Sequence, residues 1–124
     1  MKVAVSSKGK DLGAPVDPRC GRCPYFVIVD TETMTAEGVK NPGALAGTGA
    51  GVAAAQVIAN AGADVVISTL VGPNTFAALK QGGITVYGGV GGNVEAVVTK
   101  FKNGELQELE DPNAELDAGA RRRG

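Results

Sequence analysis

The chain has 124 residues, 44% of them hydrophobic, and a formal net charge of −1. This length suits one domain, and the near-zero charge gives no general attraction to nucleic acid or to an anionic membrane surface, so we expect neither as a partner. The sequence contains no histidine. A Ser–His or Cys–His catalytic pair therefore cannot form within this chain, which argues against a hydrolase and favours a protein that is not an enzyme.

The start of the chain and its apolar runs predict the compartment. Residues 1–6 lack the basic and apolar regions of a secretory signal. Charges or glycines interrupt every apolar run before it reaches the roughly 20 residues of a membrane span. We therefore expect a cytoplasmic protein, in which a pair of cysteines is more often a metal or redox site than a structural disulfide.

Hydrophobic periodicity and turn residues predict five strands and three helices in the order β-β-β-α-β-α-β-α. The strands are expected at 2–6, 25–30, 33–39, 64–69 and 84–87, and the helices at 52–61, between Gly72 and Gly82, and between Asn93 and Asn103. The hairpin and the later strand–helix alternation predict a mixed sheet of the α/β class, in which 25–30 runs antiparallel and 64–69 parallel to 2–6. Residues 1–110 form the predicted domain and 111–124 a flexible tail.

Residues 7–24 have no apolar period, and a loop of this length is typically functional or disordered. We expect it to be the most mobile internal segment and to lie outside the core. It contains Cys20 and Cys23, whose spacing lets two thiols hold one metal from one side of a turn. A metal or cluster site, a redox-active dithiol and a pair of incidental cysteines are all open at this point. Two thiolates do not complete a four-ligand site, so other ligands would come from a second copy, a partner protein or the cluster itself.

Arg19 and Arg22 flank the cysteines, where guanidinium groups would lower the thiol pKa and donate to anionic sulfur, unless they are ordinary solvated side chains. Gly47, Thr48 and Gly49 precede a helix, where N–H groups and the helix dipole favour an anion. This run is no dinucleotide fingerprint, because Val52 stands where the third glycine is needed. A flexible entry to the helix is the alternative.

Together these features resemble the dinitrogenase iron–molybdenum cofactor-binding family, the nitrogenase accessory factors and their relatives. The resemblance extends over about residues 1–110 and is most specific in the Gly-Arg-x-Pro-Tyr-Phe stretch at 21–26. It is also carried by Lys2–Val5, the rest of Asp17–Phe26 (DPRCGRCPYF), Gly49-Ala50-Gly51, Asp64–Ile67 and Gly72-Pro73-Asn74. It implies a ribonuclease H-like α/β fold with a five-stranded mixed sheet and three helices. It also implies that the protein binds, carries or stores an iron–sulfur cluster, the iron–molybdenum cofactor or its precursor.

On this interpretation Cys20 and Cys23 ligate iron, Arg19 and Arg22 balance the charge of the cluster, and Gly47, Thr48 and Gly49 donate N–H groups. The dithiol pair favours a thiolate-held iron–sulfur species. The expected partners are the metal cluster, a protein that donates or accepts it, and a second copy joined through the two cysteine loops. The alternative function is a dithiol–disulfide redox module that uses the same two cysteines.

Overall fold

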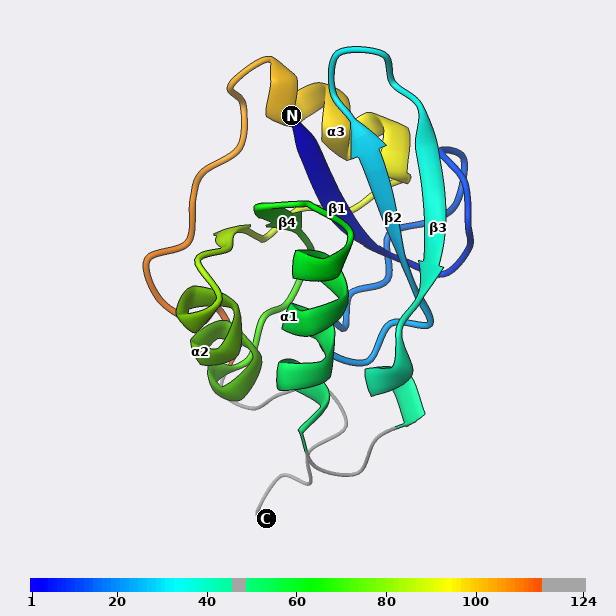
Figure 1. The fold of residues 1–124 in the computed structure, drawn as a ribbon. Helices are drawn as coiled ribbons and strands as arrows, with labels where there is room; N and C mark the ends of the chain where they lie inside the picture. The colour runs from blue at the N-terminus through cyan, green and yellow to red at the C-terminus, as the bar shows by residue number, and fades with distance from the viewer. Residues whose placement is uncertain (46–48, 115–124) are drawn as a thin grey trace.

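The structure is a computed structural model that describes residues 1–45 and 49–114. Its strands and helices follow the predicted order (Figure 1). The strands are β1 (Lys2–Ser7), β2 (Tyr25–Asp30), β3 (Ala36–Lys40), β4 (Val65–Ile67) and β5 (Thr85–Tyr87), and the helices are α1 (Ala50–Asn60), α2 (Pro73–Gln81) and α3 (Val94–Lys102). A short 3₁₀ helix, η1 (Pro42–Leu45), follows β3. None of the helices in the described residues is long and apolar enough to cross a bilayer.

The sheet is mixed and has the strand order β3-β2-β1-β4-β5. β2 lies antiparallel to β1, with Val5 opposite Val27, and β4 lies parallel to β1, with Val5 opposite Ile67. β3 forms a hairpin with β2, and β5 lies parallel to β4. Both predicted strand orientations and the predicted five-stranded α/β architecture are therefore confirmed.

Both faces of the sheet are covered, because successive side chains of a strand point to opposite faces. Ala4 packs in one core with Ile58 of α1 and Leu79 of α2. Val5 packs in a second core with Val97 of α3. Helices α1 and α2 therefore cover one face and α3 the other (Figure 1).

The segment between β1 and β2 is packed against the sheet. Val16 N donates to the Gly92 carbonyl oxygen at 2.8 Å, which ties the middle of the segment to the start of α3. Val16 belongs to the core under α3, whereas Cys20 and Cys23 belong to the core under α1 and α2. The expectation that this loop lies outside the core is wrong, because buried side chains anchor it on both faces of the sheet. Its mobility stays a prediction.

The chain after α3 returns to the sheet. Leu109 N donates to the Val86 carbonyl oxygen at 2.8 Å, and Asn113 N donates to the Val71 carbonyl oxygen at 3.1 Å. Residues 111–114, the first part of the predicted tail, therefore lie against the domain. The remainder of that tail, 115–124, lies outside the described residues.

Candidate functional site

The candidate site lies at the carboxyl ends of β1 and β4, which are adjacent in the sheet. The chain leaves these strands in opposite directions, from β1 towards β2 and from β4 through α2 towards β5. In open α/β sheets, ligands bind in the crevice at such a point. Since α1 precedes β4 and α2 follows it, the first turns of both helices lie at this same end.

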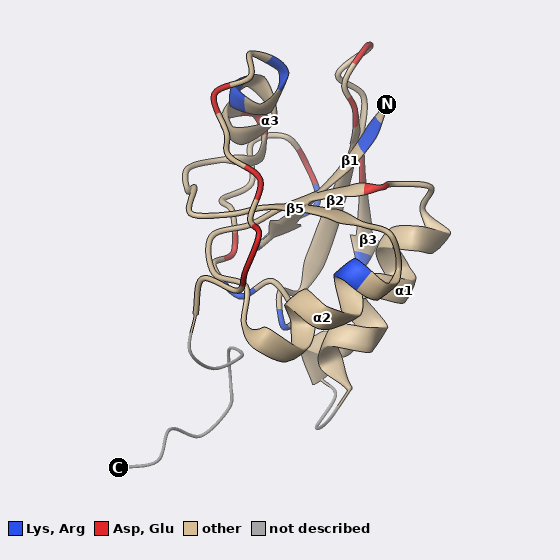
Figure 2. Ribbon diagram, turned by 90° about the vertical axis from the view of Figure 1, so that its left-hand side faces the viewer, with Lys and Arg blue, Asp and Glu red and all other residues tan. Residues whose placement is uncertain are grey.

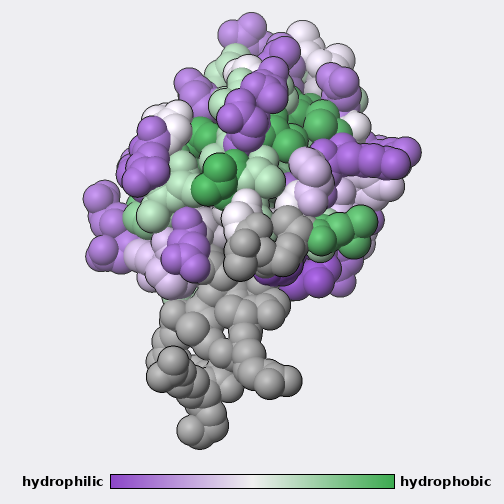
Figure 3. Space-filling view, turned by 60° about the horizontal axis from the view of Figure 1, so that its bottom comes forward, coloured by the Kyte–Doolittle hydropathy of each residue, from purple (hydrophilic) through white to green (hydrophobic). Residues whose placement is uncertain are grey.

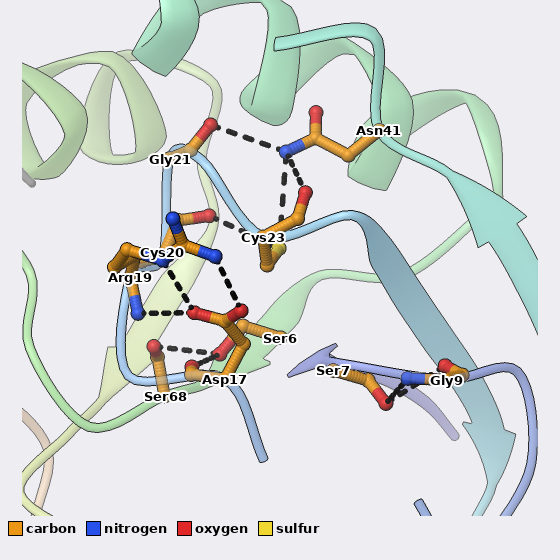
Figure 4. Close-up of polar contacts among 10 residues, drawn as sticks. All are labelled: Ser6, Ser7, Gly9, Asp17, Arg19, Cys20, Gly21, Cys23, Asn41 and Ser68. Carbon is orange, nitrogen blue, oxygen red and sulfur yellow. Dashed lines mark hydrogen bonds and ion pairs between the residues drawn. The ribbon is translucent and has the colours of Figure 1, made fainter. Parts of the chain in front are cut away.

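A buried polar network joins the two strand ends (Figure 4). Ser6 Oγ donates to the Asp17 carbonyl oxygen at 2.8 Å and lies 2.7 Å from Ser68 Oγ. Asp17 N in turn donates to the Ser6 carbonyl oxygen at 2.9 Å. Buried hydroxyl groups are costly unless they are hydrogen-bonded, so this network fixes Asp17 relative to β1 and β4.

Asp17 begins the segment that carries both cysteines, residues 17–24, which we call the cysteine loop. The Asp17 side chain is 1% exposed, and its carboxylate accepts hydrogen bonds from Arg19 N (2.8 Å), Nε (3.1 Å) and Nη2 (2.9 Å). Burial alone would raise the pKa of Asp17, but the hydrogen bonds and charge of Arg19, with the charge of Lys8, outweigh it and hold the pKa below its ordinary 3.8. The Arg19 side chain remains 51% exposed. Its guanidinium is thus held by a buried carboxylate while it still reaches solvent.

Cys20 and Cys23 lie in the core beneath the loop, with exposed fractions of 1% and 0%. Both are thiols, and Cys23 Sγ donates to the Cys20 carbonyl oxygen at 3.4 Å. Burial, followed by the neighbouring Cys20, raises the pKa of the Cys23 thiol far above its ordinary value. A buried, protonated thiol is a poor metal ligand and a poor nucleophile, because both roles require the thiolate.

Asn41 connects the cysteine loop to the segment that leads into α1 (Figure 4). Its side chain is buried, and Nδ2 donates to the carbonyl oxygens of Gly21 (3.1 Å) and Cys23 (2.9 Å). Asn41 Oδ1 accepts a hydrogen bond from Gly43 N at 3.1 Å. One side chain therefore holds the cysteine loop and η1 in a fixed relation.

Three glycines let the cysteine loop, η1 and the first turns of α1 and α2 pack closely. A Cβ atom at Gly51 would lie 2.8 Å from Thr75 Cα, and one at Gly21 would lie 2.7 Å from Thr75 Oγ1. A Cβ atom at Gly43 would lie 2.8 Å from the Ala50 carbonyl oxygen. Contacts this short require a neighbour to move, so only glycine fits these positions as they stand.

The helices at the site begin differently from α3. Gly49, with φ of 80°, precedes α1 and Gly72 precedes α2, and within the described residues neither helix has a side-chain cap. By contrast, Asn93 caps α3 by accepting a hydrogen bond from Ala96 N at 2.8 Å. Helix N-termini carry partial positive charge and N–H groups that favour anions. The two adjacent ends of α1 and α2 therefore make this part of the molecule suited to negative charge.

The structure brings together some of the predicted site residues. Arg19, Cys20 and Cys23 share one turn, which the hydrogen bond from Arg22 N to the Arg19 carbonyl oxygen closes at 3.2 Å. Gly49 is placed at the start of α1, whereas Gly47 and Thr48 lie outside the described residues.

The donor set at the site suits an anion better than a bare metal ion. Across residues 1–45 and 49–114, no group of three or more cysteine, aspartate and glutamate side chains is arranged to hold a metal ion. The backbone N–H groups and the guanidinium of Arg19 are instead donors to negative charge. The roles predicted for Cys20 and Cys23 as ligands stay predictions.

Large apolar side chains are exposed at this end of the molecule. Figure 3 shows the molecule with this end turned towards the viewer. Leu45 at the end of η1 is 96% exposed, Val52 in the first turn of α1 is 66% exposed, and Leu70 after β4 is 47% exposed. Isolated exposed apolar residues are ordinary, and these three belong to segments that begin or end beside the candidate site.

Comparison with known proteins assigns the family. The dinitrogenase iron–molybdenum cofactor family matches residues 1–104. The chain belongs to this family. An uncharacterised protein from Methanocaldococcus jannaschii is 30% identical over 113 residues, which cover 89% of this chain and 92% of that protein. Membership of the dinitrogenase iron–molybdenum cofactor family, predicted from the sequence, is thus confirmed.

Two solved structures resemble this member of the family closely. The apo form of the orange protein from Desulfovibrio gigas is 41% identical, with a TM-score of 0.87 over 91% of this chain and 96% of that chain. A NifB-related protein from Thermotoga is 38% identical, with a TM-score of 0.78 over 92% of this chain and 97% of that chain. The chain therefore spans nearly the full length of both neighbours.

Sequence analysis missed four polar residues of the site, Ser6, Asn41, Ser68 and Thr75. Ser6 is the last residue of one predicted strand and Ser68 the penultimate residue of another, which is the only local signal that could have selected them. Asn41 precedes Pro42, a pair that favours a turn, but its contacts to the cysteine loop depend on the tertiary fold. Thr75 belongs to the site because Gly21 and Gly51 pack closely against it, and no sequence pattern shows this contact.

Proposed function

We propose that this protein binds an anionic metal–sulfur cluster as cargo, at the end of the sheet where β1 and β4 finish. One observation carries the proposal. In the part of the chain that the structure describes, helices α1 and α2 begin at this end without side-chain caps, and Gly51 packs their first turns against each other at Thr75. Membership of the iron–molybdenum cofactor family and the likeness to the orange protein support it.

Hydrogen bonds and charge would hold the cluster. Backbone N–H groups near Gly49 would face its sulfur atoms, together with those of Gly47 and Thr48. Arg19, fixed by Asp17, and Arg22 would neutralise its charge from the cysteine loop. The cargo class is a sulfide-rich anionic cluster, whether an iron–sulfur cluster, the iron–molybdenum cofactor or its precursor.

Direct ligation by Cys20 and Cys23 is the competing mode of binding. It would require the cysteine loop to leave the core and both thiols to lose their protons. Because the two residues are 1% and 0% exposed, we assign them to the packing of the loop and the binding to the charged and N–H groups.

A dithiol–disulfide redox function has less support. Redox-active cysteine pairs rely on an accessible thiol with a lowered pKa. Burial raises the pKa of Cys23 instead. Carriage or storage of a cluster, without turnover, fits the described site better.

Release to another protein would use the surface beside the cluster. Leu45, Val52 and Leu70 are exposed around the site and would contact a protein that donates or accepts the cluster. The proposal therefore includes a partner protein that gives the cluster to this protein or receives the cluster from it.

The test is anaerobic incubation with ferrous iron, sulfide and molybdate, followed by desalting and analysis of metal and sulfide in the protein fraction. We expect a coloured protein that retains both. Arg22→Gln should weaken uptake about tenfold, because a charge-assisted donor is lost. Lys100→Gln, the same charge change on α3, is the matched control and should bind as the wild type does.

The double variant Cys20→Ala/Cys23→Ala separates the two modes of binding. If it is folded by circular dichroism and still takes up the cluster, hydrogen bonds and charge hold the cargo. Loss of uptake in this variant alone would show that thiolates ligate the metal. Failure of the wild-type protein to retain any metal and sulfide would contradict the proposed function itself.

A further inference from the structure

Residues 105–113 follow α3 and lie beyond the family match, which ends at residue 104. We call this extended segment the strap; in Figure 2 it is the acidic stretch that runs from α3 down towards α2. Leu109 N donates to the Val86 carbonyl oxygen at 2.8 Å, and Glu108 forms an antiparallel bridge with Tyr87. Leu109 also packs against the core under α1 and α2. The strap is therefore docked along β5.

Gly88 leaves room for the strap. A Cβ atom at Gly88 would lie 2.6 Å from Leu109 Cδ1 and 3.1 Å from Asn113 Nδ2. Both distances are shorter than ordinary van der Waals contact, so a side chain at position 88 would force the side chains of Leu109 and Asn113 to move from these positions. Gly88, which lies within the residues that match the family, thus leaves space for the side chains of the strap.

Asn113 ends the strap and grips the turn between β4 and α2. Asn113 Oδ1 accepts a hydrogen bond from Val71 N at 2.7 Å, and Asn113 Nδ2 donates to the Thr69 carbonyl oxygen at 2.9 Å. Asn113 N also donates to the Val71 carbonyl oxygen at 3.1 Å. A side-chain amide suits this position because it offers a donor and an acceptor together.

The turn between β4 and α2, which Asn113 holds, is also hydrogen-bonded to the cysteine loop. Leu70 N donates to the Pro18 carbonyl oxygen at 2.9 Å, and Cys20 N donates to the Leu70 carbonyl oxygen at 3.4 Å. Arg19 and Leu70 form a parallel bridge through these bonds. Leu70 is thus flanked by two residues held by Asn113 and bonded to the loop that carries Arg19.

We infer that the strap is a working part of the binding site and that Asn113 is a positioning residue for the cysteine loop. Through residues 69–71, Asn113 holds Pro18, Arg19 and Cys20 in the arrangement that presents the Arg19 guanidinium. The consequence for cluster affinity rests on the proposed function, whereas the ordering of the loop does not.

The test compares Asn113→Ala with Gln107→Ala by amide hydrogen exchange in the unloaded protein. Gln107 is an exposed residue of the same strap, so this control removes an amide of the same kind. Asn113→Ala should speed exchange of the Leu70, Val71 and Cys20 amides about tenfold, and the control should not. Asn113→Asp keeps the acceptor for Val71 N but loses the donor to Thr69, so it should give an intermediate rate.

Asn113→Ala should also lower the urea midpoint, because only the folded state makes these hydrogen bonds. Amides of the β2–β3 hairpin that exchange through local openings should keep their wild-type rates, which separates positioning of the cysteine loop from a general loss of stability. In the reconstitution assay the same variant should bind cluster about tenfold more weakly than Gln107→Ala does. Faster exchange at residues 69–71 with no change at Cys20 would overturn the inference, and so would unchanged cluster affinity. If the wild type binds no cluster, the proposed function fails and the exchange data alone decide the role of Asn113.

Discussion

Cys23 is a residue whose substitution tests how the cysteine loop is held. Its side chain has an exposed fraction of 0% and packs in the core under α1 and α2. We predict that Cys23→Ser lowers the free energy of unfolding by about 1–3 kcal/mol, because a hydroxyl replaces an apolar sulfur in a buried pocket. Cys23→Ala should cost about 1 kcal/mol through the cavity alone. Urea unfolding at neutral pH measures both, and wild-type stability in both variants would contradict a packed loop.

Asp17 makes the stability of the protein depend on pH. Its pKa in the folded protein lies below the ordinary 3.8, so the stability that it contributes is present above about pH 4 and is lost as the pH falls through the folded pKa. We predict that Asp17→Asn lowers the free energy of unfolding by about 2 kcal/mol at pH 7, because the charge-assisted bonds to Arg19 are weakened. The difference from the wild type should shrink between pH 4 and pH 2. Urea unfolding at several pH values tests this, and a constant difference would refute it.

At the scale of elements, the packing of α1 against α2 depends on one glycine. A Cβ atom at Gly51 would lie 2.8 Å from Thr75 Cα, which is backbone and cannot turn away. We predict that Gly51→Ala costs about 1–3 kcal/mol of unfolding free energy, although alanine favours a helix, because the two helices must separate. Thermal or urea unfolding measures the loss.

Gly91→Ala is the control for that substitution. A Cβ atom at Gly91 meets nothing within 4 Å, so alanine there should be neutral or stabilise the protein by up to about 1 kcal/mol. Equal effects of the two substitutions would show that close approach of the helices is not the cause.

The elements themselves were largely predictable from the sequence. Val94, Val97 and Val98 follow a helical period, and Asn93 before them is the cap that the structure shows. The hairpin and the strand–helix alternation were sufficient to predict the direction of β2 and β4 relative to β1. These features are local, or follow from general rules of chain connection, and therefore can be read from sequence.

The site was less predictable because its contacts are long-range. The cysteine spacing identified the loop, but nothing local shows that Cys20 and Cys23 point into the core and not to solvent. The partners of Asn41 on the cysteine loop lie far from it in the sequence. Burial of a loop is decided by the surfaces that it meets, and these exist only in the folded protein.

At the scale of the whole molecule, the sheet acts as a frame that gathers distant segments at one end. Ser6 near the end of β1, Ser68 after β4 and Asn41 after β3 all hold the cysteine loop or the strand ends beside it. Glycines then allow η1, α1 and α2 to close around this centre. The site is therefore a property of the complete domain, and the strap adds the chain after α3 to it.

The oligomeric state on loading distinguishes the two modes of cluster binding. A cubane cluster held only by thiolates takes four of them, and one chain has two cysteines, so two chains would have to share it. In the folded protein both thiols are buried, and sharing would require two cysteine loops to leave their cores. We therefore predict that the protein loads its cluster as a monomer, because N–H groups and arginines of one chain suffice.

Sedimentation velocity of the unloaded and loaded protein, read by protein absorbance and by the absorbance of the cluster, measures this directly. The cluster should sediment with a species of unchanged mass at micromolar protein concentration. Cys20→Ala/Cys23→Ala should show the same behaviour, provided that it is folded. A doubling of mass on loading that the double variant loses would refute the prediction, and would mean that the cysteine loop opens to let thiolates of two chains share one cluster.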